Sequence, residues 1–157
     1  MSLIDDPVHR DIIRLAQNAH QRHWRMDGDV GLGDQLAATV TSEWQSEVAT
    51  KYGNERFICE CPVGDLRERI DLVDTFNGVA YELKVSLNND HFEFYRDIFK
   101  VLIARDSGRP ALRSFCFFCP EVAARRYDVG LRLAVINEGG GLDCRSLSQD
   151  CNLPLRG

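Results

Sequence analysis

The segment 67–86 reads RERIDLVDTFNGVAYELKVS, and the architecture follows most directly from it. Apolar and polar residues alternate on both sides of Asn77-Gly78, a pair that favours a two-residue hairpin turn. Alternation with a period of two is typical of half-buried strands, so we predict one strand on each side of the turn. With a two-residue loop, the hairpin pairs Asp71 with Lys84.

One face of this predicted hairpin is almost wholly apolar, and the other is charged. The apolar face consists of Ile70, Leu72, Asp74, Phe76, Val79, Tyr81, Leu83 and Val85. The opposite face carries Asp71, Glu82 and Lys84, with Asp71 diagonal to Glu82. Two carboxylates at that spacing can bind one Mg²⁺, and a lysine beside them can hold an attacking water or stabilise charge on a phosphate. A solvated strand face with a simple Asp71–Lys84 ion pair is the plain alternative.

Helical patterns lie on both sides of the hairpin. Asp6 and Pro7 predict a helix start, and this helix continues to about residue 25. A second helix is predicted over about 35–52, ended by Gly53. A third, over about 91–105, carries Phe92, Tyr95, Ile98, Phe99 and Leu102 on one face. Strands are predicted over 56–63, 67–76, 79–86, 114–119 and 142–147. A weaker helix is predicted over 120–127, and the segment 131–137 either continues it or forms a strand.

This order of elements, with an aspartate on the second strand and Glu-x-Lys on the third, resembles the PD-(D/E)XK nuclease superfamily. The matching residues are Ile70-Asp71 and Glu82-Leu83-Lys84, with isoleucine where the motif name has proline. The resemblance covers about 35–119 and implies an α/β fold, a restriction endonuclease-like mixed sheet with helices on both sides. An extra N-terminal helix precedes this core, and we expect a single domain over 1–157.

The resemblance also implies an activity, the Mg²⁺-dependent endonucleolytic hydrolysis of phosphodiester bonds in DNA. Mn²⁺ would be a substitute metal, and RNA stays open as a substrate. In such enzymes the aspartate and the glutamate of Glu-x-Lys bind the metal, which assigns Asp71 and Glu82 here. The carbonyl of the residue between glutamate and lysine contributes as well, which is Leu83, and Lys84 positions the nucleophile.

Further site residues are implied on the two flanking helices. An acidic residue on the helix before the first strand completes the site, and Glu43 is preferred to Glu47 because of its spacing from Gly53. The helix after the third strand often lines the DNA groove, which makes Arg96 and Lys100 candidate phosphate contacts. For each of these helix residues, a plain solvated position is the alternative.

Charge and composition narrow the class of protein. The net charge of −5 argues against a general nucleic-acid-binding protein. Residues 96–132 differ, with eight Lys or Arg against four Asp or Glu, which favours local phosphate contacts or a solvated helix surface. No apolar run approaches the ~20 residues of a membrane span, and the N-terminus is acidic. We therefore expect a cytoplasmic protein that does not contact a membrane.

Four of the six cysteines have a spacing that zinc sites use, Cys59 with Cys61 and Cys116 with Cys119. Both pairs lie in predicted strands, where cysteine serves as a small buried hydrophobe. We therefore expect reduced thiols rather than a zinc site.

Three functions remain open from the sequence. The first is an active endonuclease, which would need a two-fold homodimer to cut both strands of a duplex. The second is a non-catalytic PD-(D/E)XK-like binding or assembly module, favoured by the acidic net charge. The third is an unrelated α/β domain, which exposure of Glu82 and Lys84 on an uncovered sheet face would favour.

Overall fold

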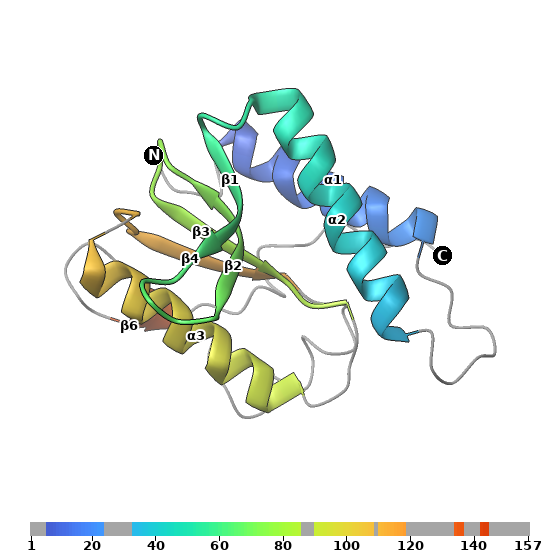
Figure 1. Ribbon diagram of the computed structural model, residues 1–157. Coiled ribbons are helices and arrows are strands. Elements are labelled where there is room, and N and C mark those ends of the chain that lie inside the picture. The colour runs from blue at the N-terminus through green and yellow to red at the C-terminus, as the bar shows by residue number, and fades with distance from the viewer. Residues whose placement is uncertain are drawn as a thin grey trace.

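The computed structural model describes residues 6–23, 33–85, 90–108, 110–118, 134–136 and 142–144 of the chain (Figure 1). The helices are α1 (Pro7–His23), α2 (Gly33–Tyr52) and α3 (Asp90–Ser107). The main sheet consists of β1 (Phe57–Pro62), β2 (Arg69–Asp74), β3 (Val79–Leu83) and β4 (Ser114–Phe118), in that spatial order. Two short strands, β5 (Ala134–Ile136) and β6 (Leu142–Cys144), pair with each other. The helix predicted over 120–127 lies outside the described residues.

Strand directions make this a mixed sheet. β1 and β2 are antiparallel, as are β2 and β3. β4 runs parallel to β3, and α3 connects the two, as parallel neighbours require a crossover. The predicted α/β class is therefore confirmed. In the described part of the chain, none of the helices has the length and apolar character that a membrane span requires.

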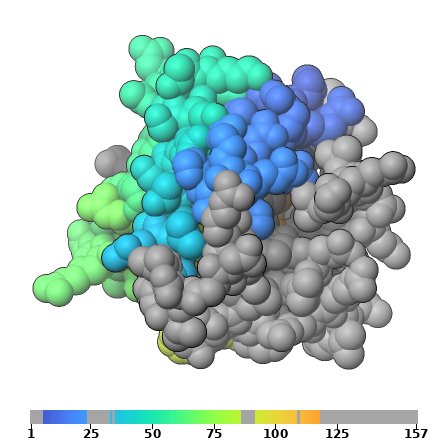
Figure 2. All heavy atoms as spheres, turned by 90° about the vertical axis from the view of Figure 1, so that its right-hand side faces the viewer, coloured from blue at the N-terminus to red at the C-terminus, as the bar shows by residue number. Residues whose placement is uncertain are grey.

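Helices cover both faces of the four-stranded sheet (Figure 1). α1 and α2 cover one face, and they lie against each other in the side view of Figure 2. The cluster beneath them includes Ile12, Val40, Trp44, Val48, Phe57, Leu72, Val79, Tyr81 and Cys116. α3 covers the other face, above a cluster that includes Ile70, Val73, Ala80, Phe94, Val101, Ala104, Phe115 and Phe117. Burial of these side chains on both faces is the main favourable contribution to folding.

The ends of the first two helices agree with the caps that the sequence predicts. Asp6 Oδ1 accepts a hydrogen bond of 2.9 Å from the Val8 backbone N–H at the start of α1. Gly53 follows α2 with a φ of 83°, which glycine adopts without steric cost. Trp44 Nε1 donates to the Ile12 carbonyl at 3.1 Å, so a buried indole N–H fixes the two helices to each other.

The loop of the β2–β3 hairpin has four residues, so the predicted two-residue turn is wrong. Strand β2 ends at Asp74, whose buried carboxylate accepts hydrogen bonds from the backbone N–H groups of Phe76 and Asn77 at 3.0 and 3.3 Å. An aspartate that binds the backbone two and three residues ahead forms a turn of its own. These N–H groups therefore do not form the backbone hydrogen bonds of a β-ladder, and β3 begins at Val79.

The longer loop moves the strand register by two residues from the predicted one. Val73 pairs with Ala80, and extension of this register by two residues places Asp71 opposite Glu82 rather than opposite Lys84. A shift of two preserves which face a side chain occupies, because strand side chains alternate with a period of two. The charged face of the hairpin therefore survives the correction, with its two carboxylates closer together than predicted.

The β1–β2 pair turns over about its own axis at Glu60. Paired residues Cys59 and Leu72 belong to the cluster under α1 and α2, whereas the next pair, Cys61 and Ile70, belongs to the cluster under α3. Residues two apart on a regular strand share a face. Glu60 lies between them with a φ of 50°, an uncommon conformation for a residue other than glycine, and this local twist accounts for the change of face.

Helix α3 is rotated so that much of its predicted apolar face points outward. The aromatic side chains of Phe92 and Phe99 are 71 % and 64 % exposed, whereas Asp97 and Lys100 are buried against the sheet. The inward position of these charged residues is explained by their partner on β3, Glu82, which is described below.

The described cysteines do not assemble into a zinc site. Cys59, Cys61 and Cys116 are free thiols. Cys59 and Cys116 belong to the cluster under α1 and α2, and Cys61 belongs to the cluster under α3. Cys119 lies outside the described residues.

Candidate active site

Asp71 is held in place through both its side chain and its backbone. Its Oδ2 accepts a hydrogen bond of 2.8 Å from the backbone N–H of Leu83 on the neighbouring strand β3. Its backbone carbonyl accepts a hydrogen bond of 2.7 Å from Gln45 Nε2 on α2. The same amide nitrogen lies 2.8 Å from Glu60 Oε1, so Gln45 connects the two residues at which the strands turn over.

Glu82 is buried, with 4 % of the residue exposed, and its charge is countered from α3. Lys100 Nζ lies 2.7 Å from Glu82 Oε1 and 2.8 Å from Asp97 Oδ1. The same ammonium donates to the backbone carbonyl of Arg69 at 2.8 Å. An ammonium has three N–H donors, so the three surrounding oxygens match its capacity.

Burial and mutual repulsion raise the pKa of both site carboxyls. For Glu82, burial is the main cause and the charges of Asp71 and Asp97 add to it, which together hold its pKa well above the ordinary range. For Asp71, burial outweighs the Leu83 hydrogen bond and the charge of Lys100 and raises the pKa to about 6. Three carboxyl groups thus lie near one ammonium, and their raised pKa values show that a further nearby cation would favour their ionised forms.

Lys84 lies beyond this cluster on the same side of the sheet. Its ammonium forms an ion pair with Glu93, in the first half of α3, and its side chain is 13 % exposed. Since α3 covers Glu82 and largely covers Lys84, the charged face of the hairpin is not the uncovered surface that would favour an unrelated domain. Glu82 and Lys84 are therefore paired with residues of α3, and Asp71 lies opposite Glu82 with its hydrogen-bond partners on β3 and α2.

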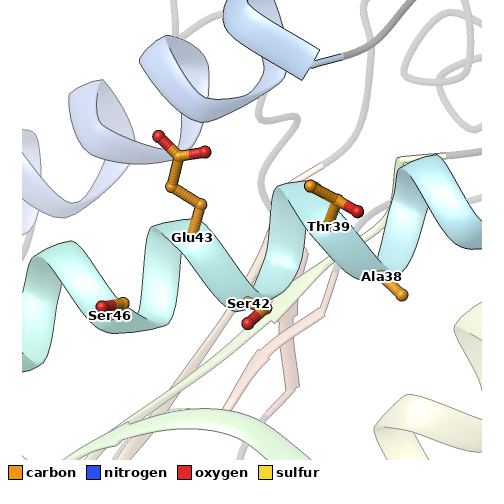
Figure 3. A pocket seen from close by; sticks show the side chains of 5 residues that line it. All are labelled: Ala38, Thr39, Ser42, Glu43 and Ser46. Atoms are coloured by element: carbon orange, nitrogen blue, oxygen red, sulfur yellow. The ribbon is translucent and has the colours of Figure 1, made fainter.

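The acidic residues predicted on α2 point elsewhere. Glu43 lies 2.8 Å from Arg22 and also pairs with His23, both at the end of α1. Glu47 lies 2.7 Å from the same Arg22. Figure 3 shows the Glu43 carboxylate directed toward the helix behind it, away from Ser42. Both glutamates thus join the α1–α2 contact, and the structure does not bring them to Asp71.

The open pocket in Figure 3 lies along this part of α2. Its lining consists of Ala38, Thr39, Ser42, Glu43 and Ser46. Small residues dominate it, and its one ionisable group is already paired with α1.

The two residues predicted to contact phosphate, Arg96 and Lys100, have different environments in the structure. Arg96 is exposed on α3, where it can meet a ligand in solution. Lys100, on the same helix, is directed inward to Glu82 and Asp97.

Two residues of the site were missed in the sequence, Gln45 and Asp97. The spacing of Asp97 and Lys100, three positions apart on a helix, is a signal for an ion pair, although it does not say which face is buried. No local pattern singles out Gln45, whose role depends on contacts with two distant strands.

The carboxylates suit a divalent cation of the magnesium type. Within the described residues, no group of three or more His, Cys, Asp or Glu side chains is arranged to hold a metal. Mg²⁺ is commonly bound by only one or two carboxylates and keeps several waters, so Asp71 and Glu82 are a sufficient pair. The donor set of two carboxylate side chains on adjacent strands, with a third carboxylate, Asp97, near Glu82, fits such an ion.

Comparison with known proteins leaves the chain without an assigned family. No family model, curated protein or solved structure matches it. A function is therefore argued from the residues of the site themselves.

Proposed function

We propose that the protein is a metal-dependent nuclease that hydrolyses phosphodiester bonds in DNA. The observation that carries this proposal is the Asp71–Glu82 pair, a half-buried and a buried carboxylate from adjacent antiparallel strands, with Lys84 on the same side of the sheet. A hard divalent cation, when bound, would polarise the phosphodiester and the attacking water. Mg²⁺ is the expected metal, with Mn²⁺ as a substitute.

The residues of the chain take distinct roles in this proposal. Asp71 and Glu82 hold the cation, with the backbone carbonyl of Leu83 as a further oxygen donor. Lys84 positions the nucleophile or stabilises charge on the phosphate once it leaves Glu93. Arg96, exposed on α3, is the proposed phosphate contact on the surface.

The arrangement of elements supports the same proposal. The order α2, β1, β2, β3, α3, β4 agrees with the helix-strand-strand-strand-helix-strand order that the resemblance to PD-(D/E)XK nucleases implies. We propose that this restriction endonuclease-like core spans about 35–119, with α1 as an addition to it. A two-fold homodimer is the proposed form for cleavage of both DNA strands, and sedimentation at several protein concentrations tests it.

The decisive experiment is a cleavage assay on plasmid and single-stranded DNA with Mg²⁺ or Mn²⁺. Lys84→Ala is compared with Lys51→Ala, a matched control in which an exposed lysine of α2 is removed far from the site. We expect cleavage by the parent and by Lys51→Ala, and a loss of about 100-fold or more in Lys84→Ala, the scale of a lost transition-state contact. Cleavage at the parent rate by Lys84→Ala contradicts the assignment.

A non-catalytic binding or assembly module is the second candidate. The observation that favours it is internal neutralisation of the site, because Lys100 already pairs with Glu82 and Glu93 already pairs with Lys84. Titration with Mn²⁺ separates the two proposals, since a module that keeps only the fold has no affinity for the metal. The cleavage assay is repeated with RNA, because the proposed phosphodiester chemistry does not distinguish an RNA substrate from a DNA substrate.

A further inference from the structure

Lys100 is one of only three lysines in the chain and is the one whose ammonium lies inside the carboxylate cluster. Its side chain is 7 % exposed, similar to the 5 % and 8 % of its partners Glu82 and Asp97. Two carboxylates within 2.8 Å of the ammonium favour its charged form. The protein thus keeps a permanent cation against a carboxylate that we assign to metal binding.

We propose that Lys100 is a resident counter-ion that a divalent metal must displace from Glu82. This inference rests on the proposed function, because it takes Glu82 to be a metal ligand. In the metal-free protein, the Lys100 ammonium stands in for the missing cation and makes burial of Glu82 tolerable. When the metal binds, the ammonium gives up Glu82 and keeps Asp97 and the Arg69 carbonyl.

The surroundings of Lys100 explain why it can move without losing its partners. Asp97 lies one helical turn before it on α3, so this ion pair remains local when the contact with Glu82 is broken. The lysine has a flexible four-carbon stem, and its point charge has no strict geometry, unlike the planar fork of arginine. Asp97 is therefore the residue that makes the exchange reversible.

The Lys100 ammonium and a divalent metal ion cannot both contact Glu82, because their positive charges repel each other. Lys100 Nζ is 2.7 Å from Glu82 Oε1, and its charge also acts on Asp71, the second proposed ligand. A divalent ion held by both carboxylates would therefore lie within a few ångströms of the ammonium. Repulsion at that distance is strong in a poorly hydrated site, so the ammonium must withdraw as the metal enters.

The test measures Mn²⁺ affinity by isothermal titration calorimetry and thermal stability with and without Mn²⁺. The variant is Lys100→Met, which keeps the aliphatic stem and removes the charge. We expect its metal-free form to be less stable than the parent, because Glu82 and Asp97 lose their partner. We also expect Mn²⁺ to bind roughly tenfold tighter or more, since one nearby repulsive charge is gone, and to raise the melting temperature by more than in the parent.

Lys84→Met is the matched control, since it removes a lysine charge from the same side of the sheet without touching Glu82. The inference requires a smaller gain in Mn²⁺ affinity for Lys84→Met than for Lys100→Met. Equal gains, or no gain in Lys100→Met, overturn the displacement model while leaving metal binding intact. No Mn²⁺ binding by the parent or by either variant overturns the proposed function instead.

Poor folding of Lys100→Met leaves the inference testable. Folding of this variant only in Mn²⁺, followed by circular dichroism, supports the inference because the metal then replaces the ammonium. Lys100→Gln serves as the second variant, since its amide is neutral but can still donate to Glu82, and the same increase in affinity is expected. Failure of both variants to fold in saturating Mn²⁺ overturns the inference.

Discussion

The carboxylate of Asp71 accepts a hydrogen bond from the backbone N–H of Leu83, 2.8 Å away, at the end of the β2–β3 ladder. A side-chain oxygen thus binds a strand N–H just beyond the last backbone pair, Leu72 with Tyr81. One carboxylate oxygen is used to fix the hairpin, and the other remains for a ligand. Asp71 therefore has a structural role and a proposed metal-binding role, and substitutions that keep only one of them can distinguish the two.

Asp71→Asn should keep the hairpin and lose the metal. The amide oxygen of asparagine can still accept the Leu83 N–H, whereas Asp71→Ala leaves that donor without a partner, at a cost of about 1–3 kcal/mol. We expect urea unfolding without metal to show Asp71→Asn at least as stable as the parent and Asp71→Ala less stable. Both variants should lose Mn²⁺ binding. Equal destabilisation by the two substitutions would show that the hydrogen bond does not hold the strand end.

Gln45 should matter more to the site than Glu43 does. Gln45 donates to the Asp71 carbonyl at 2.7 Å, whereas Glu43 pairs with Arg22 on α1. We expect Gln45→Leu to weaken Mn²⁺ binding by about 10-fold or more, the usual effect of losing a residue that orients a ligand. Glu43→Gln should leave it within a factor of about two and cost under about 1 kcal/mol of stability, since its ion pair is partly exposed. The reverse ranking would favour Glu43 as the acidic residue that completes the site.

Local sequence signals were sufficient for most elements and for the charged face of the hairpin. Alternation and helical periodicity are properties of neighbouring residues, so they predicted α1, α2, α3 and the four strands of the main sheet, with bounds that differ by a few residues. The same alternation placed Asp71, Glu82 and Lys84 on one side, and this survived the register error because that error was an even number of residues.

Features that depend on contacts between residues far apart in the chain could not be predicted from the sequence. The four-residue loop exists because Asp74 turns its carboxylate onto the loop while Arg56, from the segment before β1, supplies its counter-charge. The rotation of α3 follows from the pairing of Lys100 with Glu82. This pairing directs Lys100 toward the sheet and leaves Phe92 and Phe99 exposed. The partners of each pair are separated by many residues in the chain, whereas alternation and helical periodicity depend on neighbouring residues.

Asp74→Ala should be among the most destabilising single changes. The Asp74 carboxylate is buried and accepts hydrogen bonds from Arg56, at 3.2 and 2.9 Å, and from the backbone of Phe76 and Asn77. Removal of one partner of a buried ion pair costs about 3–5 kcal/mol. Asp74→Asn, which keeps an acceptor for the turn, should lose clearly less. Chemical denaturation of the two variants gives the comparison, and equal losses would mean that the ion pair contributes little beyond the turn.

Gly78→Ala should strain the junction between the hairpin loop and β4. Gly78 has a φ of 64°, and a Cβ atom there would lie 2.6 Å from the Ala111 carbonyl oxygen. Its own carbonyl accepts hydrogen bonds of 2.7 Å from Arg113, just before β4, and of 3.1 Å from Ser114, the first residue of β4, so the backbone cannot shift freely. We expect a loss of about 2–4 kcal/mol in the free energy of unfolding, measured by chemical denaturation.

Gly64→Ala is the control for Gly78→Ala. Gly64 also has a positive φ, 51°, but no atom lies within 4 Å of the position that a Cβ would occupy there, so only the conformational cost of about 1–2 kcal/mol applies. A loss at Gly78 no larger than that at Gly64 would show that the contact with Ala111 relaxes at little cost.

His9 should make the protein less stable as the pH falls. The imidazole lies on the buried face of α1, with its Nδ1 3.3 Å from the Tyr81 hydroxyl, and burial lowers its pKa from 6.5 to about 4, against the opposing charge of Asp6. The unfolded chain therefore binds a proton near pH 6.5 that the folded chain does not accept until about pH 4. This group leaves stability unchanged above pH 6.5 and lowers it between pH 6.5 and 4, by up to about 3 kcal/mol.

Comparison of the parent with His9→Gln isolates this contribution from that of the site carboxyls. Asp71 and Glu82 have raised pKa values, so they favour the folded state at lower pH and oppose the effect of His9. The difference in unfolding free energy between parent and variant, measured from pH 4 to 8, removes their contribution because both proteins contain them. We expect the difference to change by about 2–3 kcal/mol between pH 6.5 and 4, in the direction that disfavours the parent at acid pH. A difference that stays constant across this range would show that His9 takes up its proton as readily in the folded protein as in the unfolded chain.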